Sequence, residues 1–360
     1  MRPLFILAAI LIFGILIALH ELGHCVVAKL CGVKVNEYSI GMGPLIWQRQ
    51  GKETLYSLRA LPIGGYCAME GEDEDTGDPR SFVRQPGWKK FLILSAGCAM
   101  NFLTGVVLIL CLFWGVSAYY VDTLSGFAPG FPLEGEDGLM AGDLFYKIDG
   151  YRTYTSGDAS MFLSYHQGDT IDLVMLRDGK KVVLKDFPMV RQEYETGDGG
   201  TYTGFGLYLG RQAEEANFAV TMKYTGLYAM KFVQLVRFSL VQLLTGGASF
   251  QDLSGPVGIV AQISDMGAQS ESAEDAALNI LYFAAFIAVN LAVMNLLPIP
   301  ALDGGRILFL ALDAIGMALF RRKVPEKYQE MVNAVGMALL LGLMALVTVQ
   351  DVVKLLAGST

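Results

Sequence analysis

The sequence predicts a polytopic α-helical membrane protein of about four transmembrane helices, with an inserted β-rich domain. The first observation is compositional: 53% of the 360 residues are hydrophobic and 17% are charged, whereas a globular domain carries about a quarter charged residues. The second is a set of uncharged apolar runs long enough to cross a bilayer. The third is a polar stretch of short alternating segments, typical of β-strands, between the second and third apolar runs.

The first transmembrane helix is expected within residues 1–31. Residues 3–19 carry no charge, and the apolar pattern continues through HELGHCVVAKL, so a helix that ends near Leu30 could cross a bilayer. A cleaved signal peptide is the alternative interpretation of this run. We favour a retained helix, because no small-x-small cleavage site follows the run.

Three further apolar runs predict the remaining spans. The first of them is preceded by Trp88, Lys89 and Lys90 and followed by Trp114, Tyr119 and Tyr120, and such residues anchor helix ends at the membrane interface. The runs are residues 91–118 within the segment 91–120, residues 278–297 within 278–320, and residues 331–349 within 331–352.

Basic residues predict the orientation of these helices. Arg321, Arg322 and Lys323 lie in the loop 321–330 before the last span, and clustered Lys and Arg favour the cytoplasmic side. With four spans, the loop 32–90 is then cytoplasmic as well. Both termini and the polar middle stretch face the outside.

The segment 213–277 is expected to hold an amphipathic interfacial helix and a linker. Residues 218–244 are also long and apolar enough to form a fifth span, which is the alternative. Polar side chains recur along them at helical spacing and form one face, namely Lys231, Gln234, Arg237 and Gln242. We therefore expect a helix that lies on the outer membrane surface.

The polar stretch 121–212 is expected to form one small soluble domain. Its segments DTIDLVML and KKVVLKDF alternate in polarity as β-strands do, and RDGKK between them predicts a hairpin turn. His166, the one histidine of this stretch, is expected to be a surface residue.

Charge and cysteine content exclude two classes of protein. The net charge of -8 argues against a nucleic-acid partner, because no surplus of Lys or Arg is present to neutralise phosphates. All five cysteines lie in the first third of the chain, in or beside apolar runs, so a disulfide-stapled outer domain is not expected. We interpret Cys25 as a small buried hydrophobe rather than a metal ligand.

The segment HELGH at residues 20–24 matches the H-E-x-x-H pattern. On a helix this spacing puts the imidazoles of His20 and His24 on one face, where both can reach one metal ion. Glu21 can then take a proton from the attacking water and pass it to the leaving amine. The alternative is a buried, hydrogen-bonded histidine pair. We favour the metal site, because ionisable groups inside a span are expensive and mostly functional.

Asp303, in NLLPIPALDGGR, is the candidate for a third ligand. At 1.5 Å per residue, His20 lies about 24 Å along the first span from residue 4, close to the cytoplasmic boundary of a core about 30 Å thick. Asp303 follows the third span after a comparable descent from the same side, so both residues are expected at one depth. Asp313 is a second candidate.

Helix-breaking residues surround Asp303. Pro298, Pro300, Gly304 and Gly305 are expected to free backbone groups, which membrane interiors tolerate where they line a cavity or are buried in protein. A hydrolytic pocket needs such a cavity. The alternative is that LDGG is an ordinary loop on the cytoplasmic side.

Three motifs together resemble those of the site-2 protease family of intramembrane zinc metalloproteases, in particular its regulator of sigma-E protease type with a single PDZ domain. They are HELGH in the first span, NLLPIPALDGG after the third and SGPVGI at residues 254–259, and the resemblance covers most of the chain. One departure lies in SAGCAMNF of the second span. There Cys98 stands in place of the usual proline of the GPxxNF pattern, whereas Gly97 and Asn101 are retained.

The resemblance implies that His20, His24 and Asp303 bind Zn2+ and that Glu21 is the catalytic acid and base. It also implies that Asn295 contacts the substrate, although its spacing alone would suggest an interhelical hydrogen bond. The loop 32–90 would form a membrane-associated β-hairpin on the cytoplasmic side, whose strand edge can hold an unwound substrate. Residues 121–212 would form a PDZ-like extracytoplasmic domain.

We therefore expect a zinc endopeptidase of the bacterial plasma membrane, the inner membrane, that cleaves transmembrane segments of single-pass proteins within the lipid bilayer. Anti-sigma factors and remnant signal peptides are the substrate classes that the resemblance implies. A catalytically silent scaffold that binds peptides through its PDZ domain is the alternative, although a scaffold does not need the intact HELGH motif. A metal or proton transporter would spread its ionisable groups through the membrane depth, whereas here they gather at one level.

Overall fold

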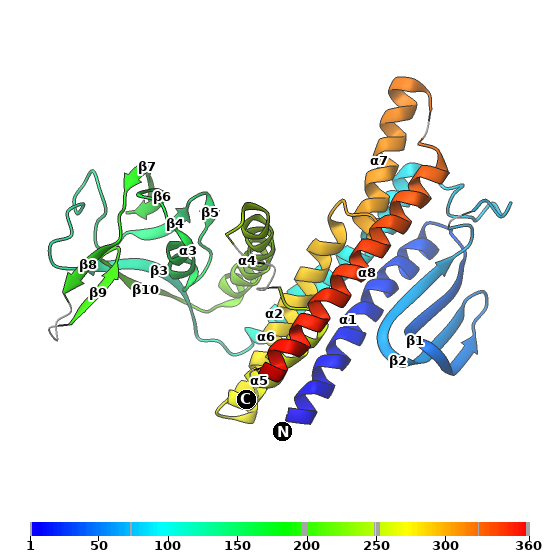
Figure 1. Cartoon of the computed structure of the whole chain (residues 1–360), viewed down its shortest axis with the longest axis horizontal. Helices are drawn as coiled ribbons and strands as arrows, with labels where there is room; N and C mark the ends of the chain where they lie inside the picture. Colours follow the sequence, from blue (N-terminus) through cyan, green and yellow to red (C-terminus); the bar gives the residue numbers. More distant parts are fainter. Residues whose placement is uncertain are drawn as a thin grey trace. The chain divides into compact units, whose positions relative to one another are not determined.

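The computed structural model describes residues 2–72, 74–195, 200–247, 249, 253–322 and 324–357. It divides into two compact units, which we describe separately (Figure 1). The helical unit comprises Met1–Leu112 and Val236–Thr360, and the β-rich unit comprises Phe113–Leu235. Lys323, part of the basic cluster used to predict orientation, lies outside the described residues.

The helical unit is built from long apolar helices. In Figure 1, the N-terminal end of α1 and the C-terminal end of α8 lie at the same end of this unit, and α1 and α6 run in the same direction. The helices are α1 (Arg2–Leu30), α2 (Gly87–Leu112), α5 (Pro256–Gln269), α6 (Ala273–Leu296), α7 (Asp303–Phe320) and α8 (Glu326–Ala357).

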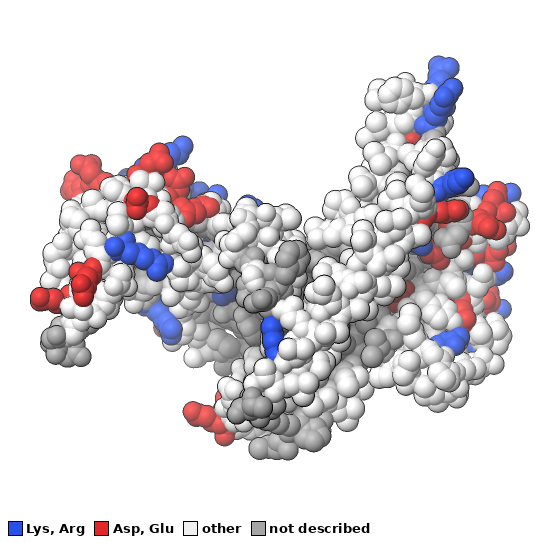
Figure 2. All heavy atoms as spheres, in the orientation of Figure 1, with Lys and Arg blue, Asp and Glu red and all other residues white. Residues whose placement is uncertain are grey.

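Among the described residues, five helices are long and apolar enough to cross a membrane, one more than the sequence analysis favoured. Four belong to the helical unit, namely α1, α2, α6 and α8, and the fifth is α4 (Phe218–Thr245). Only 11% of the most apolar window of α8 is buried within the protein, and Leu339, Leu346 and Val349 are exposed. The visible face of α8 carries almost no Lys, Arg, Asp or Glu (Figure 2). An apolar helix surface of this length suits contact with lipid.

Several predicted helix boundaries differ from those of the structure. The last span was expected at residues 331–352 after a loop at 321–330, but α8 begins at Glu326 and ends at Ala357. The second span was expected to reach residue 118, but α2 ends at Leu112, a turn with Gly115 at φ +83° follows, and Ala118 begins a strand. The segment 278–320 forms two helices, because the chain leaves α6 after Leu296 and re-enters a helix at Asp303.

The residues between α6 and α7 explain this break. Pro298 and Pro300 have no amide hydrogen to donate to a helix, and Ala301 adopts φ +73°. Gly304 and Gly305 were expected to break the helix, but they form the first turn of α7. A Cβ on Gly304 would collide with the carbonyl oxygens of Leu296 and Leu297, so these glycines let α7 start against the break.

The loop after α1 forms an antiparallel hairpin of β1 (Val35–Gln50) and β2 (Leu55–Met69). Gly41, Gly43 and Gly64 have φ near +80° to +88° and lie within the strands, where the register shifts, rather than at the turn between them. Such bulges bend and twist a hairpin. The hairpin packs on the C-terminal half of α1 through a common core, and the hydroxyl of Tyr38 donates to the carbonyl of Ala18 at 2.8 Å.

The β-rich unit contains a twisted sheet with the strand order β10-β3-β4-β6-β7, and β5 pairs with β4. The turn between β6 and β7 has Asp178 and Gly179 at φ +50° and +75°, as the RDGKK segment predicted for a tight hairpin. The elements are β3 (Ala118–Phe127), β4 (Leu144–Ile148), β5 (Tyr151–Arg152), α3 (Asp158–Tyr165), β6 (Thr170–Arg177), β7 (Lys180–Pro188), β8 (Gln192–Glu195), β9 (Thr201–Gly204) and β10 (Leu207–Glu215).

Polar side chains of α4 bind within the β-rich unit. The ammonium of Lys231 lies 2.7 Å from the buried carboxylate of Asp158. The side chain of Gln234 donates to the carbonyl of Arg152 at 2.6 Å and accepts from its amide at 2.9 Å. Two residues of the predicted polar face therefore contact protein rather than water or lipid headgroups.

Candidate metal centre

The first half of the candidate site lies near the C-terminal end of α1. His20 and His24 are four residues apart, so both imidazoles project from one face, and both residues are buried. Their Nε2 atoms are 3.3 Å apart. Gly23 lies between them in the sequence, and a Cβ there would collide with the carbonyl oxygen of Ala96. The glycine therefore lets α2 approach the histidine face of α1 closely.

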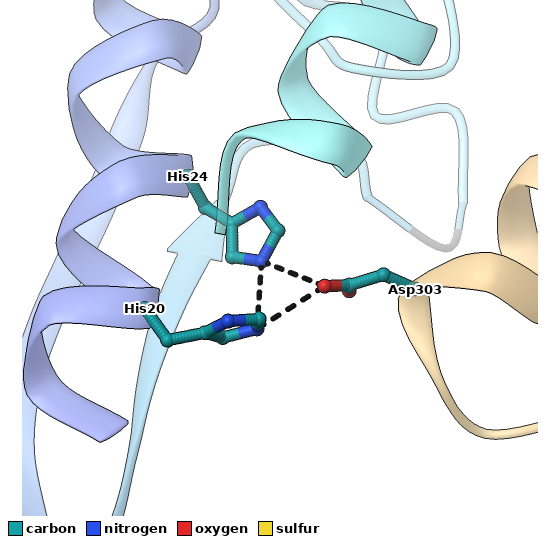
Figure 3. Close-up of side chains that lie close together, drawn as sticks. All are labelled: His20, His24 and Asp303. Atoms are coloured by element: carbon teal, nitrogen blue, oxygen red, sulfur yellow. Dashed lines mark hydrogen bonds and ion pairs between the residues drawn. The ribbon is translucent and has the colours of Figure 1, made fainter. Parts of the chain in front are cut away.

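Asp303 reaches the two histidines from the first turn of α7 (Figure 3). Its Oδ2 atom lies 3.1 Å from Nε2 of His20 and 3.3 Å from Nε2 of His24. The three ligand atoms all lie within 4.8 Å of one another. The structure thus brings together residues that are about 280 positions apart in the sequence. The second candidate, Asp313, instead accepts a hydrogen bond from the amide of Val324 at 2.9 Å.

The donor atoms of this group fit a zinc ion. Zinc takes imidazole nitrogen and carboxylate oxygen at about 2.0–2.2 Å, and in a tetrahedral site two such ligands are about 3.3 Å apart. The three distances of 3.1, 3.3 and 3.3 Å match one face of that tetrahedron. The fourth position can stay open, as a hydrolytic zinc site requires.

The hydrogen bond of His24 also favours a cation. Its Nδ1 atom lies 2.8 Å from the carbonyl oxygen of Ile93, which can only accept, so Nδ1 carries the hydrogen. In the neutral ring, Nε2 then presents a lone pair toward the oxygen of Asp303. Lone pairs that converge in a buried place repel one another unless a cation lies between them.

Helix α2 covers the histidines with four residues. Asn101 contacts Nδ1 of His20 at 3.3 Å, and the thiol of Cys98 donates to Oδ2 of Asp303 at 3.6 Å. At Gly97, a Cβ would lie 2.6 Å from Cε1 of His20 and would collide with Nε2 of His24. Together with Ile93, these residues form the face of α2 that contacts the site. This face can lie so close to the two imidazoles because residue 97 is a glycine.

Glu21 lines a cavity of about 350 Å³ beside His24 and Asp303. One wall of the cavity is β2. Gly65 of this strand faces Glu21, and a Cβ there would lie 2.9 Å from the carbonyl oxygen of Ser39, so the glycine lets β2 pack closely against β1 at this point. At the rim, the guanidinium of Arg306 pairs with the carboxylate of Glu72. The described residues that line the cavity are Glu21, His24, Tyr66, Cys67, Ala68, Met69, Glu72, Leu94, Asp303 and Arg306.

Three other residues singled out by the sequence are not part of this group of three ligand atoms. Asn295 is half-buried in the last turn of α6 and does not line the described cavity. Cys25 is 3% exposed and packs in the core shared by α1 and the hairpin, as a small hydrophobe does. His166, expected to be a surface residue, is partly buried in the β-rich unit, where its Nδ1 donates to the carboxylate of Asp149 at 2.7 Å.

Three contacts of α2 with the site were not predicted from the sequence. The available signal was the spacing of Ile93, Gly97 and Asn101, which recur every four residues and so share one helix face. That signal does not identify the partner of this face, and the carbonyl of Ile93 cannot be distinguished in a sequence from any other backbone carbonyl.

Comparison with known proteins identifies the family of this chain. The model of peptidase family M50 matches residues 8–343. A relative from Clostridium perfringens is 35% identical over 97% of this chain and 99% of its own length, and one from Clostridium acetobutylicum is 37% identical over 97% of each chain. A third, from Campylobacter jejuni, is 30% identical over 97% of this chain and 94% of its own.

All three relatives carry the name "Putative zinc metalloprotease". The family match covers both the HELGH segment and the segment that contains Asp303. The apolar helices of the structure agree with the membrane location of such an enzyme. The chain therefore belongs to peptidase family M50, the site-2 protease family, and is a multi-pass membrane protease.

Proposed function

We propose that this chain is an intramembrane zinc endopeptidase that hydrolyses a peptide bond within or beside the transmembrane segment of a single-pass protein. The observation that carries the proposal is the convergence of His20, His24 and Asp303 within 4.8 Å, with Glu21 lining the cavity beside them. A silent scaffold has no need of this group.

His20 and His24 would hold zinc through Nε2, and Asp303 through Oδ2. When bound, zinc lowers the pKa of a water molecule and polarises the peptide carbonyl. Glu21 accepts the proton of the attacking water and delivers it to the nitrogen of the leaving amine. Glu21 and His24 are three residues apart on α1 and so share one face of the helix. Both side chains line the cavity.

The wall of the cavity suggests how a substrate is held. A transmembrane helix hides its peptide bonds in its own hydrogen bonds, so cleavage needs a locally extended segment. Residues Tyr66–Met69 of β2 line the cavity, and a strand edge can bind an extended peptide through backbone hydrogen bonds. Asn295, at the end of α6, would contact this segment near the scissile bond.

The site also supports four spans rather than five. His20 and His24 lie toward the C-terminal end of α1, and Asp303 follows the C-terminal end of α6, so these helices run in the same direction (Figure 1). After α1 crosses and α2 returns, α6 can repeat the direction of α1 only if α4 makes no net crossing. The contacts of Lys231 and Gln234 with the β-rich unit agree with an α4 outside the lipid core.

The domain arrangement follows from this topology. The hairpin loop and the loop 321–330 are cytoplasmic, whereas the β-rich unit, the linker before α6 and both ends of the chain are extracytoplasmic. The β-rich unit is PDZ-like and would admit substrates already trimmed outside the membrane. By family resemblance, the chain acts in the bacterial plasma membrane, on anti-sigma factors or remnant signal peptides.

Substitution of the proposed acid and base tests the function. The detergent-purified chain should cleave a model transmembrane peptide and lose this activity with a chelator. E21Q should retain wild-type zinc content, because Glu21 is not a ligand, and should cleave about 10²–10⁴-fold more slowly, because proton transfer is lost. Mass spectrometry of the products and elemental analysis measure the two quantities.

E274Q is the matched control, because Glu274 is exposed in the first turn of α6. It should cleave as the wild type does. Full activity of E21Q would remove Glu21 from its role. Peptide binding without any cleavage by the zinc-loaded wild type would favour the scaffold.

A further inference from the structure

Asn101 is a buried polar residue of α2 that the hydrolytic mechanism does not use. It is 1% exposed, and its Nδ2 atom lies 3.3 Å from Nδ1 of His20. Its carbonyl oxygen Oδ1 is buried and has no hydrogen-bond partner among the described residues. Buried amide oxygens are rarely left in this state, because the hydrogen bond lost to water is not replaced.

The chemistry of His20 identifies a partner for this oxygen. If Nε2 of the neutral ring offers its lone pair to a cation, the hydrogen must reside on Nδ1, which is then a donor. The group beside Nδ1 is the carboxamide of Asn101, whose two ends have nearly the same shape. Rotated by half a turn, the carboxamide presents Oδ1 in place of Nδ2 and accepts the hydrogen from Nδ1, while Nδ2 takes the buried position that Oδ1 held.

His24 has the equivalent arrangement with a backbone group. Its Nδ1 atom donates to the carbonyl of Ile93 at 2.8 Å. Ile93 and Asn101 are eight residues apart on α2, which is close to two helical turns, and Gly97 lies between them where a side chain would strike both imidazoles. One face of α2 therefore contacts the Nδ1 atoms of both histidines.

We propose that Asn101 is a positioning residue of the metal centre, whose carbonyl accepts the Nδ1 hydrogen of His20 and so directs Nε2 toward the ion. The inference rests on the proposed function, since it requires His20 to be a ligand. Partners of this kind fix the tautomer and the ring orientation of a ligating histidine, and their loss weakens metal binding about 10–100-fold.

Two substitutions of Asn101 distinguish a role in orienting His20 from a role in packing alone. Leucine has nearly the same size and no acceptor, so N101L should bind zinc about 10–100-fold more weakly. Aspartate accepts the Nδ1 hydrogen, so N101D should stay within about threefold of the wild type, as carboxylate–histidine–zinc arrangements do. A role in packing alone predicts the opposite order, because leucine suits an apolar helix interface better than a carboxylate does.

The test is a zinc titration of the full-length chain in detergent, against a chromophoric chelator of known affinity. The absorption spectrum of the cobalt-substituted protein gives a second measure of the coordination geometry. N290L is the matched control, because Asn290 is a partly buried asparagine of α6, and its zinc affinity should not change. Thermal unfolding without metal checks that each variant is folded; if N101L is not, N101A removes the same acceptor without added bulk.

The outcomes distinguish the inference from the function on which it rests. Weak binding by N101L, recovery in N101D and no change in N290L support the proposal. Wild-type affinity of N101L, or equal losses in N101L and N101D, would overturn it. H20A decides the remaining question: if H20A binds zinc normally, the metal site itself is wrong, whereas if only H20A loses zinc, the role of Asn101 is wrong and the site stands.

Discussion

At the scale of single residues, the candidate site depends on small side chains as much as on the groups that carry chemistry. The distances of 3.1–3.3 Å among the nitrogen and oxygen atoms are possible because α1 and α2 touch at Gly23 and Gly97. Gly23 admits the backbone of Ala96, and Gly97 leaves room for both imidazoles. The glycine of HELGH is therefore part of the site's geometry, although it has no functional group.

A methyl group at position 97 should disable the site without unfolding the chain. In G97A, the new Cβ would occupy the space of the two imidazoles, yet alanine is the better helix former, so α2 itself should persist. We expect at least about a tenfold loss of zinc affinity, the range seen when the supports of metal ligands are removed. Elemental analysis and chelator competition measure this loss, and thermal unfolding of the metal-free protein should show little change.

Gly342 provides the control for this substitution. It lies in α8, and nothing lies within 4 Å of the position of its Cβ. G342A should therefore bind zinc and cleave peptide as the wild type does. A G97A variant with normal zinc affinity would mean that the two helices are farther apart than we describe.

At the scale of elements, the helix ends carry the information that apolar runs lack. The break between α6 and α7 brings Asp303 to the histidines, and it depends on Pro298, Pro300 and the left-handed Ala301. The start of α5 depends on a distant residue. Gly255, its N-cap, has no side chain to cap the helix, and the carboxylate of Asp351 in α8 accepts from the amides of Gly255 at 2.9 Å and Gly258 at 2.8 Å.

Removal of this cap should destabilise the helical unit. Asp351 is 3% exposed, so D351A leaves two amides without an acceptor in a place that water does not reach. We expect a loss of about 1–3 kcal/mol in the free energy of unfolding, and a smaller loss for D351N, which keeps one acceptor oxygen. Equilibrium unfolding in detergent micelles measures both. D265A, at an exposed position of α5, is the control; stability of D351A equal to that of D265A would contradict the capping role.

At the scale of the whole molecule, the topology depends on the number of membrane crossings. Five described helices are long and apolar enough to cross a membrane. In the topology that we propose, α4 does not cross the membrane. Arg322 and Glu74 should then face the cytoplasm, whereas Lys180 and Glu271 face the outside. All four are exposed.

Single cysteines at these four positions, in a variant without the native cysteines, test this arrangement. A membrane-impermeant maleimide added to intact cells should label positions 180 and 271, and positions 74 and 322 only after lysis. Under a five-span arrangement, positions 271 and 322 exchange sides, because α4 reverses the direction of everything that follows. Labelling of position 322 in intact cells is thus incompatible with our topology.

The sequence by itself determined what is local in this protein. Uninterrupted apolar composition identifies α1, α2, α6 and α8, alternation identifies the β6–β7 hairpin, and the spacing of His20 and His24 places two imidazoles on one face. These properties follow from the periods of the helix and the strand, which any segment expresses without its partners. The need for a carboxylate ligand could also be inferred from the sequence, with Asp303 as the candidate and Asp313 as the weaker alternative.

Only the tertiary structure decided which distant groups meet. It brings Asp303 rather than Asp313 to the histidines, sets Gly97 and Asn101 of α2 against them, and directs the polar face of α4 to the β-rich unit. Helix packing joins residues whose separation in the chain has no period, and its partners include backbone carbonyls, such as that of Ile93, which every residue possesses. A local sequence pattern therefore cannot predict these contacts between helices, although the contacts hold the site together.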